Sequence, residues 1–258
     1  MPHLSVNIDH VATLRQARYR AGAHAPTHFH EYGEPDVARA FHEVELANAH
    51  GVTLHLREDR RHVTDRDVDI VRAQTRIKFN LEMAATDEMV AIASRVKPHS
   101  AMLVPEGRNE VTTEGGLDVA SQLPRMKDVV HRLRAAGCLV SAFIDADLKQ
   151  VRAARDAGFD ICEVHTGPYA HAFLEFGGDL HHRAVAARYE AVRRAGEEIL
   201  TLGMRFNAGH ALNYHNVAPI ASLPNISELH IGHSIVSRAI YVGLRTAVAE
   251  MLQAMHAR

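Results

Sequence analysis

The sequence is poor in cysteine and has no tryptophan. Its two cysteines, Cys138 and Cys162, lie in apolar stretches that are typical of buried thiols, so we expect inert core residues and no disulfide framework. No apolar run approaches the length of a membrane span, and residues 1–6 enter an apolar segment without the charged and apolar regions of a secretory signal. These absences predict a cytoplasmic protein with no membrane partner.

An excess of one charge is also missing. The formal net charge is −2 and no lysine- or arginine-rich block stands out, which argues against a nucleic-acid partner. Lysine is scarce: the chain has only Lys78, Lys97, Lys127 and Lys149, and arginine supplies the rest of its Lys and Arg residues. The planar arginine fork suits phosphate and carboxylate ligands, but codon bias explains the same skew, so the skew alone decides nothing.

The residues that are present favour one large α/β domain. At 258 residues, 47% of them apolar, the chain is long enough for a single core. Short apolar segments typical of strands alternate with amphipathic segments typical of helices, with no break in composition. The eight predicted strands span residues 4–8, 52–56, 78–82, 100–104, 139–144, 160–165, 204–207 and 228–231. This alternation predicts a (β/α)8 TIM barrel, with residues 1–258 forming a single catalytic domain.

Polar and ionisable side chains stand at the carboxyl ends of these predicted strands. In a closed barrel those ends meet around one mouth, so residues far apart in the sequence become neighbours. Any one of them could be a cap or a supporting contact, whereas several at one rim indicate a site. The residues concerned are Asn7, Asp9, His55, Glu82, Glu163, His210 and His233.

Two parts of this rim suit anions. Arg57 and His62 follow the second strand, where a ligand-binding loop and a solvated loop with salt bridges fit the segment equally well. The loops after the seventh and eighth strands, which commonly bind phosphate in barrels, contain Gly-His-Ala at 209–211 and Gly-His-Ser at 232–234. Their glycines allow close backbone approach to a ligand, although tight turns alone would also need them.

The same rim offers candidates for proton transfer. Histidine titrates near neutrality and a partly buried glutamate can be raised toward it, so we select His55, Glu82 and His210 as general acids and bases. Lys78 opens the third strand at the opposite face of the barrel, which argues against a Schiff base on an enzyme lysine. The first strand ends in Asn-Ile-Asp-His and not in His-x-His, so the metal-hydrolase pattern is weak.

Several longer motifs resemble the pyridoxine 5′-phosphate synthase family, and the resemblance runs nearly end to end. The motifs are VNIDHVATLR at 6–15, HLREDRRH at 55–62, TDRD at 64–67, NLEM at 80–83, EVTTEGGLD at 110–118, FIDA at 143–146, NAGH at 207–210 and IGH at 231–233.

The resemblance implies a transferase of vitamin B6 biosynthesis. The expected reaction condenses 1-deoxy-D-xylulose 5-phosphate with 3-amino-2-oxopropyl phosphate to pyridoxine 5′-phosphate, phosphate and water, without a metal or organic cofactor. Family resemblance also implies a homo-octamer built from dimers, with extra short helices on the barrel. The implied catalytic residues are His55 and Glu82 as proton acceptors, His210 as proton donor and Glu163 as a stabiliser of developing positive charge.

The resemblance assigns the remaining polar residues to the two substrates. Around the deoxyxylulose phosphate it implies Asp9, His10, Arg57, His62 and Thr112. Around the amino-ketone phosphate it implies Asn7, Arg18, Ala211, Gly232 and His233.

The chain departs from the family pattern at three places. Ala211 replaces the glycine that is usual in the family. If the backbone φ at this position is negative, alanine can still offer its backbone N–H to a phosphate. If the backbone is left-handed, alanine would be strained. His230 replaces the usual asparagine of the last strand, and an insertion near residues 21–35 puts the placement of Arg18 in doubt.

Two other readings of the same residues stay open. The first is a metal-dependent phosphosugar epimerase or aldolase of the same fold, with Glu82, His165 and His210 as metal ligands. The second is a non-enzymatic scaffold in which the rim histidines are merely satisfied polar groups.

Overall fold

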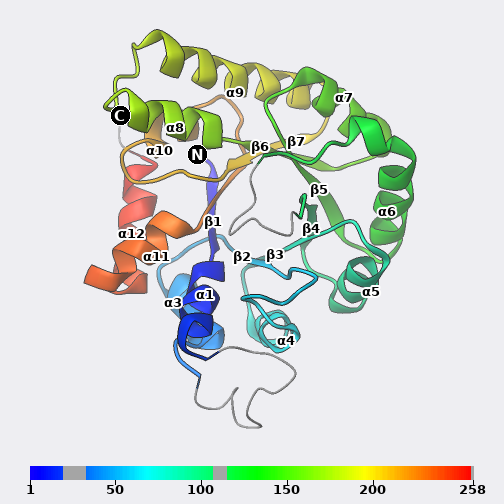
Figure 1. Cartoon of the computed structure of the whole chain (residues 1–258), viewed down its shortest axis with the longest axis vertical. Helices are drawn as coiled ribbons and strands as arrows, with labels where there is room; N and C mark the ends of the chain where they lie inside the picture. The colour runs from blue at the N-terminus through cyan, green and yellow to red at the C-terminus, as the bar shows by residue number, and fades with distance from the viewer. Residues whose placement is uncertain (20–32, 107–114, 257–258) are drawn as a thin grey trace.

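The computed structural model describes residues 1–19, 33–106 and 115–256, and the predicted substrate residue Thr112 lies outside these ranges. Its strands form a closed, all-parallel barrel in sequence order, with β8 pairing back onto β1 (Figure 1). This confirms the predicted TIM barrel. The strands are β1 (His3–Asn7), β2 (Gly51–His55), β3 (Lys78–Met83), β4 (Ser100–Leu103), β5 (Leu139–Ile144), β6 (Ile161–His165), β7 (Arg205–Gly209) and β8 (Glu228–Ile231).

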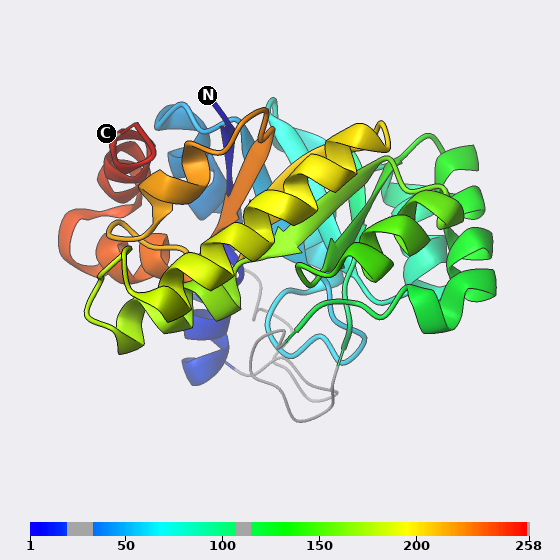
Figure 2. The same cartoon turned by 90° about the horizontal axis from the view of Figure 1, so that it is seen from above.

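Helices surround the barrel on its outer side. Figure 2 shows the long helix α9 lying against the outside of β6 and β7, and apolar residues such as Val192 and Ile199 cover that part of the core. The described helices are α1 (Asp9–Arg18), α3 (Val37–Leu46), α4 (Asp65–Gln74), α5 (Asp87–Val96), the 3-10 helix η1 (Ala120–Gln122), α6 (Leu123–Ala135), α7 (Leu148–Ala157), α8 (Gly167–Glu175), α9 (Arg183–Thr201), α10 (Val217–Ala221), α11 (His233–Val242) and α12 (Leu244–Ala254).

Local sequence explains where several of these helices begin. Thr64 and Asp67 form a reciprocal capping box at the start of α4, and the side chains of Thr86 and Asp147 accept backbone N–H groups at the starts of α5 and α7. Gly243 at φ +81° separates α11 from α12. A turn containing Gly177 and Gly178, both at positive φ, separates α8 from α9.

The barrel interior is polar. Strand register pairs Asn80 with Ser100, whose side chains hydrogen-bond at 2.6 Å, and the hydroxyl groups of Ser5 on β1 and Thr53 on β2 hydrogen-bond at 2.9 Å. The alternate residues, such as Val52 and Leu54, are fully buried beneath the helices. Period-two alternation therefore directs the apolar half of each strand to the outer core and leaves the barrel axis to hydroxyl, amide and ionisable groups.

Other predictions about the chain concern membranes and thiols. Within the described residues, the helices are all too short or too polar to cross a membrane. Cys138 and Cys162 are free and buried, as predicted, and burial raises the pKa of the Cys162 thiol to about 12.

Candidate active site

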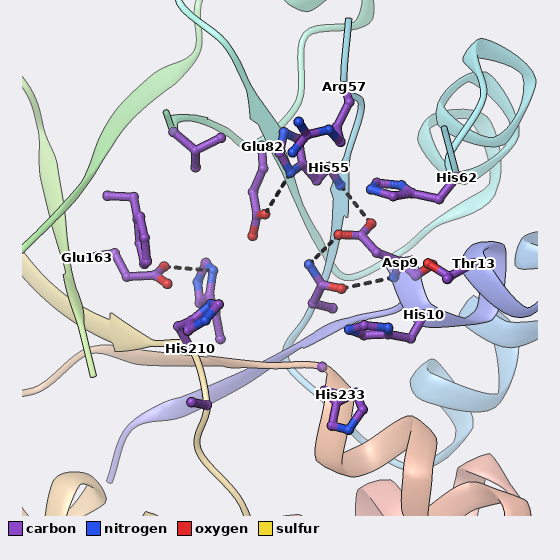
Figure 3. Close-up of a pocket in the computed structure, with 16 residues that line it drawn as sticks. Asp9, His10, Thr13, His55, Arg57, His62, Glu82, Glu163, His210 and His233 are labelled. Carbon is purple, nitrogen blue, oxygen red and sulfur yellow. Dashed lines mark hydrogen bonds and ion pairs between the residues drawn. The ribbon is translucent and has the colours of Figure 1, made fainter. Parts of the chain in front are cut away.

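The carboxyl ends of the strands surround a cavity of about 460 Å³ (Figure 3). It collects side chains from the first strand to the last, as the predicted convergence requires. The lining residues are Asn7, Asp9, His10, Thr13, His55, Arg57, His62, Glu82, Val104, Phe143, Glu163, His210, Ala211, His230, Gly232 and His233.

The cavity contains every predicted site residue that the structure describes except Arg18. Arg18 lies on the exposed last turn of α1, outside the cavity lining. His165 also lies outside the lining, but its ring is 5.0 Å from that of His210, and its Nδ1 atom is 3.0 Å from Asp145. The metal-ligand set of Glu82, His165 and His210 is therefore split between the lining and the layer behind it.

His55 is surrounded by carboxylates. Its Nε2 atom is 2.9 Å from Glu106, its Nδ1 atom is 3.9 Å from Glu82, and its backbone N–H donates to Asp9 at 2.8 Å. Asn7 donates a further hydrogen bond to Asp9 at 2.7 Å. The imidazole is therefore fixed in orientation, with one nitrogen held by Glu106 and the other facing Glu82.

These contacts set the protonation of the two groups. Burial alone would lower the pKa of His55, but the hydrogen bond to Glu106 and the charges of Glu82 and Asp9 outweigh it and raise that pKa. Burial raises the pKa of Glu82 to about 7, with the Asp9 charge adding to the shift and the His55 charge opposing it. A carboxyl group with a pKa near neutrality can both give and accept a proton at physiological pH.

Glu163 lies deeper in the barrel, beside His230. The two side chains are 3% and 6% exposed, and Glu163 Oε2 is 3.0 Å from His230 Nδ1. Gly209 on β7 makes room for this carboxylate, since a Cβ atom there would lie 2.3 Å from Glu163 Oε1 and 2.8 Å from the carbonyl oxygen of His230. Sequence reasoning attributed the glycine to ligand approach or to a turn, whereas the structure shows that it accommodates Glu163.

The side of the cavity near α11 suits an anion. Gly232 precedes α11 and lies against Asn7, so close that a Cβ atom would be 2.9 Å from the Asn7 carbonyl oxygen. The first turn of α11 presents backbone N–H groups and the positive end of the helix dipole. His10 and His233 meet edge to face nearby, with ring centroids 4.9 Å apart.

His210 and Ala211 both have left-handed backbones. Their φ values are +78° and +59°, so alanine occupies the strained alternative at position 211 and not the negative φ that would suit it. Burial, followed by the charge of His165, lowers the pKa of His210 to about 4. His210 is therefore a neutral imidazole at pH 7 before any ligand binds.

Within the described residues, Asp9, His55 and Glu82 form a group that could in principle hold a metal ion. One ligand atom from each lies within 4.8 Å of the others. The Asp9 oxygens accept from the His55 backbone and from Asn7, and Nε2 of His55 is hydrogen-bonded to Glu106. Nδ1 of His55 faces the Glu82 carboxylate at 3.9 Å, so these two groups are placed either to exchange a proton or to share a metal ion, and a chelator distinguishes the two.

Comparison with known proteins decides the family. A family model described as "Pyridoxal phosphate biosynthesis protein PdxJ" matches residues 4–257. The chain belongs to the PdxJ family.

Relatives of this PdxJ chain are similar over almost their whole length. A pyridoxine 5′-phosphate synthase of Azoarcus sp. (strain BH72) is 59% identical over 255 residues, covering 99% of this chain and 98% of the relative. One of Dechloromonas aromatica is 58% identical over 251 residues, covering 97% and 95%. A thiamine phosphate pyrophosphorylase structure from Pyrococcus furiosus, at 14% identity, has a TM-score of 0.60 and covers 98% of this chain and 95% of that one, which shows the shared barrel fold alone.

Several contributors to this PdxJ site were not predicted. Glu106 stands in the irregular segment after β4, where no periodicity marks a side chain that returns to the mouth. Phe143 and Val104 supply apolar walls, and their type could not be distinguished from ordinary core residues. Thr13 lies one helical turn beyond His10 on α1, and this spacing could have revealed it.

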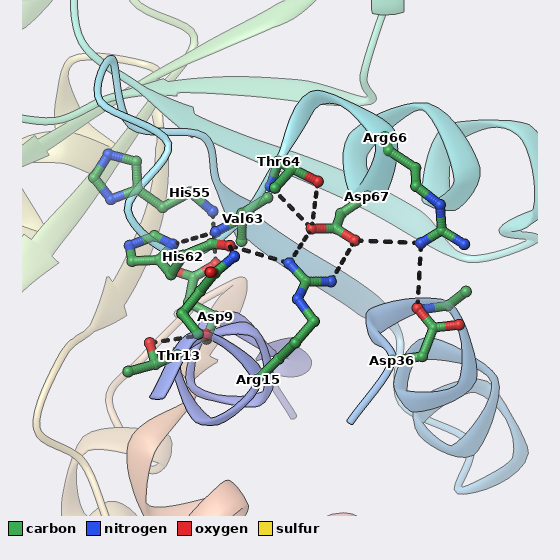
Figure 4. Close-up of polar contacts among 12 residues, drawn as sticks. Asp9, Thr13, Arg15, Asp36, His55, His62, Val63, Thr64, Arg66 and Asp67 are labelled. Carbon is green, nitrogen blue, oxygen red and sulfur yellow. Dashed lines mark hydrogen bonds and ion pairs between the residues drawn. The ribbon is translucent and has the colours of Figure 1, made fainter. Parts of the chain in front are cut away.

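A buried ion pair positions the loop that carries Arg57 and His62 (Figure 4). Arg15 on α1 donates to both carboxylate oxygens of Asp67 on α4, at 2.8 and 2.7 Å, and also to the carbonyl oxygen of His62 at 3.1 Å. The side chains of Arg15 and Asp67 are 2% and 0% exposed. This bidentate pair ties α1 and α4 to the loop and thereby holds His62 at the cavity wall.

We expect Asp67→Asn to lower the free energy of unfolding by about 3–5 kcal/mol, because it leaves the Arg15 charge buried without a carboxylate. The matched control is Asp65→Asn on the same helix, whose half-exposed carboxylate pairs with Arg60 and should cost no more than about 1 kcal/mol. Denaturant unfolding of both variants provides the test. Equal losses would contradict the assigned importance of the pair.

We expect Ala211→Gly to raise the free energy of unfolding by about 1 kcal/mol, because glycine tolerates the left-handed backbone that strains alanine. Ala186→Gly, on the exposed face of α9, is the control and should lower it by about 1 kcal/mol. Thermal unfolding curves compare the two variants. A loss of stability in Ala211→Gly would show that the backbone at 211 carries no such strain.

Proposed function

We propose that this chain is a pyridoxine 5′-phosphate synthase that condenses 1-deoxy-D-xylulose 5-phosphate with 3-amino-2-oxopropyl phosphate. The products are pyridoxine 5′-phosphate, phosphate and water. One observation carries the proposal: a chain 59% identical to an enzyme of that name gathers His55, Glu82 and His210 around a single cavity. Family membership places the product in pyridoxal phosphate biosynthesis.

The chemistry matches the residue types of the cavity. The amino group of 3-amino-2-oxopropyl phosphate attacks the ketone of the deoxyxylulose phosphate, so the nucleophile comes from a substrate. Lysine is absent from the described lining residues, and Lys78 pairs with Glu228 on a different part of β3 and β8. Acids and bases that expel water and phosphate are then the main requirement for the enzyme.

Glu82 and His55 carry the proton transfers near the attacked ketone. With its pKa at about 7, Glu82 exists in both protonation states near neutrality. The raised pKa of His55 shifts this imidazole toward its protonated form compared with a free histidine, so it can both donate and accept a proton during the reaction. The contact of 3.9 Å between His55 and Glu82 allows the two groups to share this task.

His210 acts on the other reactant. A phosphate dianion bound at Ala211 and Gly232 would lie close to His210 and raise the pKa of the neutral imidazole, because opposite charge favours its protonated form. Substrate binding would then supply the proton that His210 donates. Arg57 and His62, on the opposite wall, bind the phosphate of the sugar.

The assay that tests the function mixes both phosphorylated substrates with the protein and records pyridine absorbance together with released phosphate. We expect the two products in equal amounts, and a loss of at least about 100-fold in kcat for Glu82→Gln because a general acid–base group is removed. Asp69→Asn, on the exposed face of α4, is the control and should retain activity. Absence of product, or activity that a chelator removes and a divalent metal restores, would contradict the proposal.

The assembly and location of the protein belong to the same proposal. We expect a cytoplasmic homo-octamer, a tetramer of dimers, and the described chain exposes large apolar side chains suited to interfaces. These include Leu174 on α8, 81% exposed, and Ile240 and Tyr241 on α11, 71% and 81% exposed. Light scattering should give eight times the chain mass of 28.5 kDa, and a monomer mass at micromolar concentration would contradict the prediction.

A further inference from the structure

A row of ionisable side chains lies inside the barrel beneath the cavity. Glu163 on β6 faces His230 on β8, with 3.0 Å between Oε2 and Nδ1, and His230 Nε2 is 3.7 Å from Glu228. Glu228 in turn forms an ion pair with Lys78 on β3. Charges of alternating sign therefore follow one another from the cavity toward the amino ends of the strands.

A neighbouring cation favours the ionised form of Glu163 at this depth. Its side chain is 3% exposed, and burying a carboxylate without a compensating charge favours the protonated, neutral form. Among the residues that the structure describes, His230 is the one basic side chain within ion-pair distance of Glu163. Burial raises the pKa of Glu163, and the His230 charge opposes that shift.

Carboxylates face His230 from three strands. Glu163 approaches it from β6, Glu82 acts on it from β3, and Glu228 lies on its own strand. Asn80, also on β3, places its amide nitrogen 3.5 Å from Nδ1. Burial lowers the pKa of His230, but the three carboxylates outweigh burial and raise it to about 9. The charge of Lys78 is held away from the imidazole by its ion pair with Glu228.

We propose that His230 is a positioning residue for the condensation, whose imidazolium keeps Glu163 a carboxylate directed at the cavity. There Glu163 can stabilise the positive charge that develops when the substrate amine adds to the ketone. The role in catalysis rests on the proposed function, whereas the ionisation of Glu163 does not depend on it.

The neighbouring backbone supports this arrangement. Gly209 leaves the space that the Glu163 carboxylate fills, and the carbonyl oxygen of His230 borders the same space. The carboxylate thus lies against β7 and β8. An asparagine at position 230, which the family resemblance gives as the usual residue, would keep a polar side chain but remove the cation.

Replacing the cation should change the pH dependence of activity. In His230→Asn, Glu163 loses the larger of the two histidine charges that oppose the effect of burial, with His165 supplying the smaller one, so its pKa rises. Because the carboxylate form of Glu163 is required in addition to the ionisation of Glu82, the acidic limb of the kcat/KM profile should steepen or move to higher pH, with a further loss of about tenfold or more on the acidic side. KM for both substrates should stay within about threefold, since His230 acts through Glu163.

The experiment compares wild type, His230→Asn, Glu163→Gln and the double variant, with His181→Asn on an exposed turn as the histidine control. We expect the His230→Asn substitution to cause no further loss in the Glu163→Gln background, and His181→Asn to behave as wild type. The inference would be overturned if the acidic limb of His230→Asn neither steepened nor shifted and the losses of the two single variants added in the double variant. His230 would then have a merely structural role.

A substrate-free readout separates this inference from the proposed function. Infrared difference spectra of wild type against Glu163→Gln should show an ionised carboxylate at pH 7, and those of His230→Asn a protonated carboxyl. Nitrogen NMR of the unmodified protein should show His230 as an imidazolium at the same pH, which needs no variant to fold. A neutral His230 in wild type would overturn the inference, even if pyridoxine 5′-phosphate is formed.

Discussion

The structure depends on the compensation of buried carboxylates by imidazolium and guanidinium groups. Closing eight parallel strands into a barrel brings Asp9, Glu82 and Glu163 together around one cavity. Such charges repel one another and favour protonation unless cations or hydrogen-bond donors lie beside them. Two histidines lie beside these carboxylates: His55 lies between Glu82 on β3 and Glu106 in the segment after β4, and His230 lies between Glu163 on β6 and Glu228 on β8.

This constraint divides the cavity into groups with opposite protonation. On the side of β2 and β3, carboxylates raise the pKa of His55. On the side of β7, His210 lies beside His165 and in a dry environment, and its pKa falls to about 4. A condensation that both removes and supplies protons needs acids and bases whose pKa values are separated in this way. The two sides of one cavity therefore differ in charge state although the same residue type, histidine, serves both.

Much of this architecture could be predicted from the sequence. Regular alternation of apolar and amphipathic segments gave the barrel, and residues 139–144 and 228–231 match β5 and β8. Because the polar residues at strand ends converge by topology alone, the lining residues His55, Glu82 and His210 followed without any contact being known. The residues that contact these side chains could not be predicted. Glu106 lies in an irregular segment, and His230 differed from other strand residues only by its departure from the family pattern.

Backbone conformation was also beyond the sequence. The sequence allowed either a negative or a left-handed φ at Ala211. The structure of the turn after β7 shows the left-handed value. The boundary between α11 and α12 lies at Gly243, whose φ of +81° interrupts the helix. Positions of this kind are set by tertiary packing, which overrides local preference.

The most direct test of the account is the pH dependence of kcat/KM for pyridoxine 5′-phosphate formation by the unmodified protein. The buried carboxylates and histidines predict an acidic limb with an apparent pKa close to that of Glu82, which is about 7. A profile that stays flat between about pH 5 and pH 8 would contradict the claim that charge compensation inside the barrel prepares these groups for catalysis.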